Sequence, residues 1–127
     1  MTNCFGKMLI LDCDDCNGII DNKNYIQTFI DNLVEGMGMK KKGDTIFEYF
    51  EDNDYNRQRD IVGYSVVQII SLSNITIHIN EISRTIYLDV FTCGDLNEEK
   101  FISLVNDYFK PTKIKNKVIT RDAKSID

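Results

Sequence analysis

The chain has 127 residues, enough for one ordinary domain and too few for two. Hydrophobic residues make up 43% of it and charged residues 28%, which is typical of a soluble globular protein. The formal net charge of −5 argues against binding to nucleic acid, because phosphate binding needs a surplus of lysine and arginine. No apolar run approaches the roughly 20 residues that cross a bilayer. The N-terminus also lacks the pattern of a secretory signal, so we expect a cytoplasmic protein without membrane association.

Hydrophobic periodicity in the first half of the chain predicts one helix and three strands. Apolar residues recur about every 3.6 residues in NYIQTFIDNLVEGMGM, residues 24–39, which predicts an amphipathic helix that Gly36 and Gly38 end. The polar stretch 52–60 predicts a loop. Three strands are predicted from apolar, aromatic or β-branched runs, at residues 7–13, 44–52 and 61–70.

The second half of the chain predicts a hairpin followed by a second helix. Two β-branched runs, NITIHIN and TIYLDVFTC, predict paired strands joined by a turn near Glu81–Arg84. Asp95 and Glu98 have the spacing of a capping box, which predicts that the helix NEEKFISLVNDYFK opens there.

The chain closes on a last predicted strand, KIKNKVITRD at residues 113–122, whose lysines discourage pairing at an exposed edge. This order of elements predicts an α+β fold, a two-layer sandwich in which two helices pack on one face of a mainly antiparallel sheet. We expect one domain that spans residues 1–127.

The cysteines raise the question of a metal or redox site. Cys13 and Cys16 have the C-x-x-C spacing that is typical of both. A zinc site needs two further soft ligands, for which the chain offers only Cys4, Cys93 and His78. The two aspartates between Cys13 and Cys16 would raise the thiol pKa values, the opposite of what a redox pair needs. We therefore interpret CDDC as the end of a strand running into a loop, and expect no metal.

The predicted hairpin holds the only histidine of the chain, His78, together with Ser73 and Cys93. Strand alternation places Thr76 and His78 on one face, opposite three isoleucines. A lone histidine or cysteine in such a strand is often structural. No G-x-S-x-G elbow supports a serine hydrolase. The residues alone leave the function open.

A resemblance to a known family narrows the range of possible functions. DVFTCGD at residues 89–95, preceded by SNITIH at 73–78, resembles the core signature of the prokaryotic-type S-adenosylmethionine decarboxylases. GYS at 63–65 falls where the family has Gly-x-Ser, MLILDCDDCN is similar to its opening strand, and FKPTKI fits its Leu-Lys-Pro ending. The resemblance covers most of the chain, apart from a longer segment near 51–60.

The resemblance implies a self-cleaving proenzyme whose cofactor is a pyruvoyl group, without pyridoxal phosphate or metal. The cut would fall between Leu72 and Ser73, giving a β chain of residues 1–72 and an α chain of residues 73–127 headed by a pyruvoyl group made from Ser73. Its ketone would form a Schiff base with the substrate amine and act as the electron sink. The product would supply the aminopropyl group of spermidine. The family also implies a homodimer of processed αβ protomers, with active sites that use residues from both.

Three further residues take roles by their position in the resemblance. Ser65 would hold the tetrahedral intermediate of self-cleavage, and His78 would move the elimination proton. Cys93 would donate the proton that quenches the carbanion left by carbon dioxide. A thiol suits this role because its reference pKa, about 8.5, keeps it mostly protonated near neutrality.

The chain departs from the family pattern at two places. Leu72 and Asn74 stand where the family has Glu and His on either side of the cleaved serine. Residues 79–82 replace a Thr-Trp-Pro-Glu segment whose aromatic ring stacks on adenine and whose acid reaches the ribose. Rings that could replace the missing one are Phe47, Tyr49, Phe50 and Tyr55. Two alternatives therefore stay open: a pyruvoyl-dependent decarboxylase of ornithine or arginine, and a non-processing homologue that serves as a binding or regulatory subunit.

Overall fold

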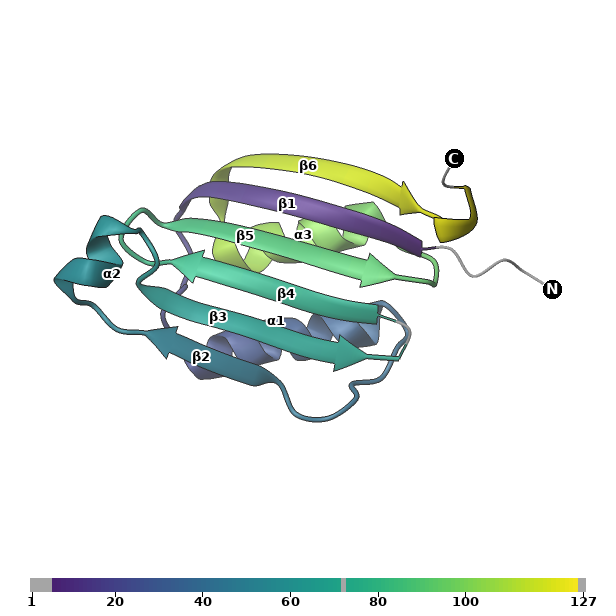
Figure 1. Cartoon of the computed structure of the whole chain (residues 1–127), viewed down its shortest axis with the longest axis horizontal. Helices are drawn as coiled ribbons and strands as arrows, with labels where there is room; N and C mark the ends of the chain where they lie inside the picture. Colours follow the sequence, from purple (N-terminus) through teal and green to yellow (C-terminus); the bar gives the residue numbers. More distant parts are fainter. Residues whose placement is uncertain (1–5, 72, 126–127) are drawn as a thin grey trace.

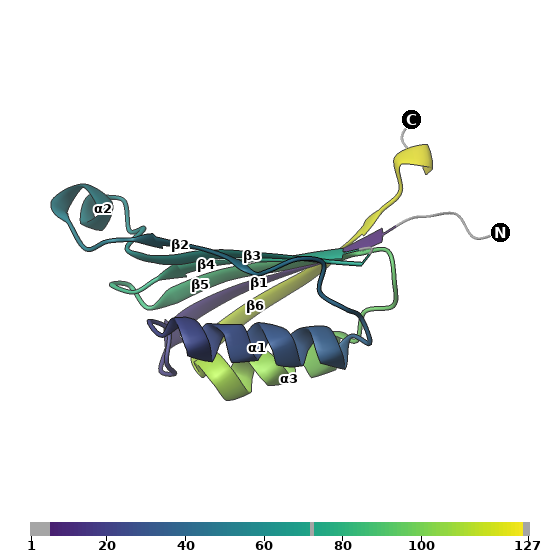
Figure 2. The same ribbon diagram turned by 90° about the horizontal axis from the view of Figure 1, so that it is seen from below.

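The computed structural model describes residues 6–71 and 73–125 and consists of a sheet layer and a helix layer (Figure 1). Its six strands form one antiparallel sheet in the order β2-β3-β4-β5-β1-β6. Figure 2 shows α1 and α3 side by side on one face of this sheet. The predicted α+β arrangement is therefore confirmed. In chain order the elements are β1 (Gly6–Cys16), α1 (Lys23–Gly36), β2 (Ile46–Phe50), α2 (Asp54–Gln58), β3 (Gly63–Ile70), β4 (Ser73–Asn80), β5 (Thr85–Thr92), α3 (Glu98–Phe109), β6 (Pro111–Arg121) and a 3-10 turn (Ala123–Ser125).

Side-chain alternation gives the sheet a covered face, which packs on α1 and α3, and an open face on the other side. In β4, Ile75, Ile77 and Ile79 point to the helices and are at most 2% exposed. Thr76 and His78 lie on the open face, as the alternation predicted. The hairpin is thus apolar on the side that builds the core and polar on the side that carries the histidine.

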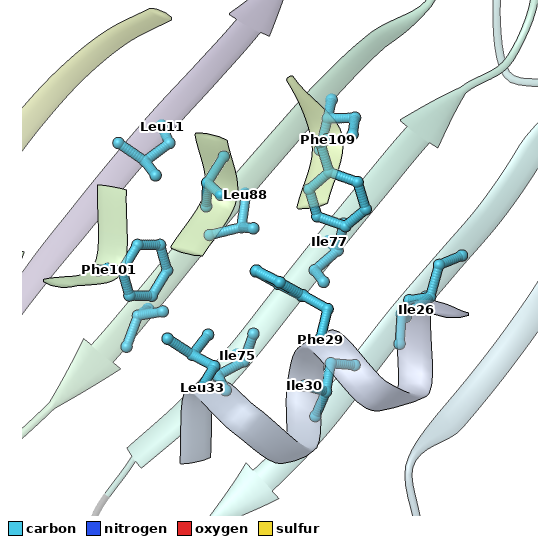
Figure 3. Packing of buried hydrophobic residues seen from close by; sticks show 14 of the residues in the cluster. Leu11, Ile26, Phe29, Ile30, Leu33, Ile75, Ile77, Leu88, Phe101 and Phe109 are labelled. Carbon is cyan, nitrogen blue, oxygen red and sulfur yellow. The ribbon is translucent and has the colours of Figure 1, made fainter. Parts of the chain in front are cut away.

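The core lies between the covered face and the two helices, as Figure 3 shows. Phe29 of α1 and Phe109 of α3 pack with their ring centroids 4.7 Å apart, and both are fully buried. Both rings lie over the middle of the sheet, near Ile77 and Leu88. Fully burying one such side chain contributes about 1.5–3 kcal/mol, so this layer accounts for much of the stability. No helix within residues 6–71 and 73–125 is long and apolar enough to span a bilayer.

One predicted helix boundary is wrong and another is confirmed. The side chain of Asn97, not of Asp95, caps α3 and accepts a hydrogen bond from the backbone N–H of Lys100 at 3.1 Å. Asn97 stands directly before the helix and reaches the third helical N–H, which leaves no role for the predicted box of Asp95 and Glu98. At the end of α1, Gly36 is the last helical residue and Gly38 adopts a φ of +68°, as expected for a glycine stop.

The polar stretch predicted as a loop contains a short helix, α2. The side chain of Asn53 caps it by accepting from the N–H of Asn56, and the buried amide of Asn56 donates to the Glu51 carbonyl oxygen at 2.8 Å. These local bonds order a segment that hydrophobic periodicity could not reveal. Residues 51–60, here called the α2 excursion, rise from the end of the sheet toward its open side (Figure 2).

The strand order interlocks the two halves of the chain. β1 lies between β5 and β6, so that Leu9 pairs with Val90 on one side and with Val118 on the other. Arg84 in the β4–β5 turn donates hydrogen bonds from its guanidinium to the backbone carbonyl oxygens of Cys16 and Gly18. The first and last parts of the chain therefore share one continuous sheet.

Cys13 and Cys16 lie in the core at the end of β1, which continues to Cys16 and is three residues longer there than predicted. They are 3% and 0% exposed. Burial is the largest cause that raises the pKa of Cys13 to about 12 and the pKa of Cys16 to about 11. Where the structure describes the chain, no three histidine, cysteine or carboxylate side chains gather as metal ligands.

We expect Cys13 and Cys16 to resist alkylation in the folded protein. At pH 8 such pKa values leave roughly one thiol in a thousand or fewer as the reactive thiolate. Iodoacetamide treatment followed by peptide mass mapping measures this, with urea-unfolded protein as the control that reacts fully. Equal labelling of both cysteines in folded and unfolded protein would contradict their burial.

Candidate active site

Ser65 and His78 form a pair on the open face. Ser65 of β3 lies directly opposite His78 of β4, and its Oγ is 3.0 Å from the imidazole Nδ1. On the other side, His78 faces Tyr87 of β5, which is half exposed. The strand register alone produces this contact, because directly opposed side chains on one face are the closest neighbours in an antiparallel sheet.

An acidic side chain lies near the histidine on the same face. Asp89 pairs with Thr76 and with Ile10 on the neighbouring strands. Burial raises the pKa of the Asp89 carboxyl, and the positive charge of His78 partly offsets this effect. The open face around His78 therefore carries a hydroxyl, a phenol and a carboxyl group, the kinds of group that move protons.

Ser73 and Cys93 lie at the opposite end of the same strands. Ser73 is the first residue of β4 and pairs with both Ile70 and Thr92. Cys93 follows Thr92 directly and is half buried. Leu72, on the other side of the predicted cut, lies outside the described residues.

The four predicted site residues thus form two pairs and do not meet in one protomer. Ser73 and His78 are five positions apart on β4, which corresponds to about 16 Å. An odd spacing also turns their side chains to opposite faces of the sheet. Ser73 with Cys93 marks one end of β4, and Ser65 with His78 marks the other.

Met39 lies beside Ser73, although no sequence pattern predicts it there. The Ser73 hydroxyl donates to the thioether Sδ of Met39 at 3.2 Å. Met39 is held there because the neighbouring Lys40 carbonyl oxygen accepts from the Ser71 N–H, and the Lys42 N–H donates to the Ile69 carbonyl oxygen. The two partners are 34 positions apart, so no local pattern could have revealed the contact.

A cavity of about 420 Å³ lies beside the Ser65–His78 pair. The aromatic residues Phe50 and Tyr87 line it, and so does Asp60. Of the four rings considered from sequence, Phe50 is the one that lines this cavity. Tyr87 was missed, because its place opposite His78 follows from the register of β5 and not from any motif.

The other three rings are engaged elsewhere. Phe47 and Tyr49 pack on Tyr64, with ring centroids 5.9 and 4.7 Å away. Tyr55 stacks under the guanidinium of Arg59 on the α2 excursion. The aromatic character of the cavity therefore comes from β2 and β5.

Comparison with known proteins identifies the family of this chain. The family model described as S-adenosylmethionine decarboxylase matches residues 7–122. Among solved structures, the crystal structure of the adenosylmethionine decarboxylase from Aquifex aeolicus VF5 is similar over 99% of this chain and 100% of that one, with a TM-score of 0.76 and 18% sequence identity. A search of curated protein sequences gives no significant match. Because the family model covers nearly the whole chain, the chain belongs to the S-adenosylmethionine decarboxylase family.

Proposed function

We propose that the chain is a self-processing, pyruvoyl-dependent decarboxylase of S-adenosylmethionine. The family consists of pyruvoyl-dependent carboxy-lyases, which supports the reaction class. The observation that carries the proposal is the position of Ser73, which starts β4 after a connection of only two residues and lies beside the Thr92–Cys93 segment. The Ser65–His78 pair supplies a hydroxyl and an imidazole within hydrogen-bonding distance of each other.

Self-cleavage is chemistry that the chain performs on itself. The Ser73 hydroxyl attacks the Leu72 carbonyl carbon, and the peptide bond becomes an ester with a free amine at position 73. Removal of the Ser73 Cα proton expels the Leu72 carboxylate from Cβ and leaves a dehydroalanine. Uptake of water releases ammonia and leaves a ketone. Met39 fits this sequence, because a thioether is a weak acceptor that releases the Ser73 hydroxyl at little cost.

The sheet is suited to a cut at this position. The bond between residues 72 and 73 lies in the connection of two strands that pair over most of their length, from Ile70 with Ser73 to Ser65 with His78. β1 from the first fragment would remain between β5 and β6 from the second. Both fragments are thus retained by the same hydrogen bonds that hold the uncut chain.

A second copy on the open face would complete the site. This face exposes apolar side chains, among them Ile69 at 51% and Tyr87 at 49%. Consider a two-fold axis that lies above the open face, perpendicular to the strands, near the middle of β4. This axis places the first end of β4 in one copy over the last end of β4 in the other copy. The strand end with Ser73 and Cys93 in one copy would then lie over the strand end with Ser65 and His78 in the other, as in the homodimer that the family resemblance implies. The Ser73 hydroxyl points to the covered face in the described chain, so residue 73 would have to turn to the open side at this strand end for the two pairs to meet.

Within such a site each residue has one task. A ketone at position 73 would supply the electron sink for loss of carbon dioxide. Ser65 would stabilise the oxyanion of self-cleavage, and His78 would carry the Cα proton of Ser73. Cys93 would return a proton to the substrate carbon.

The cavity favours S-adenosylmethionine over a simple amino acid. Phe50 and Tyr87 line the cavity with aromatic rings on which a base could stack, and ornithine and arginine have no base. Product analysis with the three candidate substrates tests this choice. If carbon dioxide is released from ornithine or arginine and not from S-adenosylmethionine, the proposed substrate is wrong and the proposed type of reaction still holds.

Purified wild-type protein should consist of two fragments, residues 1–72 and 73–127, and the second should react with carbonyl reagents. The Ser73→Ala variant should remain one chain, because it lacks the attacking hydroxyl. Intact-mass measurement reads both results, and size-exclusion chromatography should show the wild-type fragments eluting together. A wild-type chain that is not cleaved would contradict the proposed function. Cleavage of the Ser73→Ala variant at the same bond would contradict the role of Ser73.

Mixed dimers should reveal a site shared between copies. A His78→Ala chain alone should split about 10²- to 10⁴-fold more slowly, the usual contribution of a positioned acid–base group. Co-expression with a differently tagged Ser73→Ala chain should restore splitting of the His78→Ala chain, because the intact His78 then comes from the other copy. A partner that carries both substitutions is the control and should not rescue. Mixed dimers without rescue would place the whole site within one protomer.

Cys93→Ala should separate processing from turnover. We expect the variant to split like wild type, because Cys93 has no part in cleavage. Its decarboxylation of S-adenosylmethionine should fall about 10²- to 10⁴-fold, since the substrate carbon loses its proton donor. Intact-mass measurement gives the extent of cleavage, and carbon dioxide release gives the rate of decarboxylation. An unchanged rate of decarboxylation would contradict the proton-donor role of Cys93.

A further inference from the structure

The cavity beside the Ser65–His78 pair carries a carboxylate with no cation to balance it. Asp60 ends the α2 excursion and lines the cavity together with Phe50, Asn80 and Tyr87. Asp60 is half buried, while Asp52 and Asp54 on the same segment are exposed. Among the residues that the structure describes, none forms a hydrogen bond or ion pair with the Asp60 side chain. Asp60 therefore lines the cavity with a carboxylate that has no hydrogen-bond or ion-pair partner among the described residues.

The cations nearest in the chain are engaged elsewhere. Arg57 forms a two-pronged ion pair with Asp52. The Arg59 guanidinium lies 3.4 Å from the Tyr55 ring centroid and donates to the Tyr55 carbonyl oxygen. Both arginines are thus turned onto their own segment, and neither lines the cavity. This arrangement keeps the carboxylate of Asp60 available to a ligand.

We infer that Asp60 selects substrates that carry a second positive charge away from the reacting amine. The carboxylate attracts such a cation directly, and the aromatic residues Phe50 and Tyr87 line the same cavity. A volume of about 420 Å³ lies in the range of small-molecule sites. The sulfonium of S-adenosylmethionine meets this requirement. The assignment to substrate rests on the proposed function, whereas the charge preference of the cavity can be measured without it.

The backbone at Asp60 allows a clean test. Its φ of +52° is left-handed, a conformation that asparagine tolerates nearly as well as aspartate, so Asp60→Asn removes the charge without straining the chain. Asp54→Asn is the matched control, because it removes an exposed carboxylate of the same segment that does not line the cavity. Both changes are made in the Ser73→Ala chain, which makes no ketone and therefore does not turn over substrate.

Calorimetric titration compares S-adenosylmethionine with S-adenosylhomocysteine, which lacks the sulfonium charge and its methyl group. The Ser73→Ala chain should prefer the charged ligand. Asp60→Asn should weaken S-adenosylmethionine binding about tenfold, the lower end of what loss of one charge-assisted contact removes, and leave S-adenosylhomocysteine within about twofold. Asp54→Asn should change neither ligand by more than about twofold.

Three results would overturn the inference: equal weakening of both ligands by Asp60→Asn, the same loss of preference with Asp54→Asn, or no binding of either ligand. In the processed wild-type background, Asp60→Asn should raise KM for S-adenosylmethionine about tenfold and leave the fraction of split chain unchanged. A wild-type chain that never splits would remove the proposed function, while the titration would still decide the charge preference. A wild-type chain that splits and decarboxylates, with no change in Asp60→Asn, would remove the role of Asp60 alone.

Discussion

The register of β4 between β3 and β5 is the constraint on which the rest of the structure depends. It places His78 opposite Ser65 and Tyr87, and it places Ser73 opposite Ile70 and Thr92. A shift by one residue would turn His78 into the core and expose the isoleucines that build it. The apolar side of the strand is fully covered by α1 and α3, so the packing of the core fixes the chemistry of the open face. Stability and the position of the reactive side chains are thus set by one alternation.

The interlocked sheet explains how the chain tolerates the cut that the proposal requires. A break in the connection between β3 and β4 leaves both strands paired, and β1 remains between two strands of the second fragment. The backbone bonds between Gly18 and Phe109 and between Asn17 and Lys110 add contacts across the same division. Fragments joined in this way separate only when the whole sheet unfolds. The proposed precursor and product therefore share one fold, and cleavage changes only the end of a strand.

Local patterns predicted the elements well because burial here follows simple periods. The helix at Lys23–Gly36 and the strands around His78 were visible from spacing alone, and so was the face on which His78 lies. The short helix α2 was not predicted, because it is held by the side chains of Asn53 and Asn56 and has no apolar stripe. The resemblance named Ser65, Ser73, His78 and Cys93 but could not show that they divide between two ends of β4. That division depends on strand length and register, which appear only in three dimensions, as do Met39 beside Ser73 and Tyr87 beside His78.

Two departures from the family pattern meet at one end of the sheet. Residues 79–82 lack the ring that the family places after the histidine, and Ile82 stands where the family has its acid. The α2 excursion is the segment that the resemblance does not cover. Phe50 directly precedes that excursion and Asp60 ends it, and both line the cavity beside His78. β2 and the excursion thus supply an aromatic ring and a carboxylate to the site from another part of the chain. If these groups bind substrate as proposed, the chain has kept the chemical character of the pocket while changing the segment that supplies it. Residues for the reaction would then lie on β3, on β4 and at the end of β5, and residues for recognition would come from β2, from β5 and from the loop that joins β2 to β3.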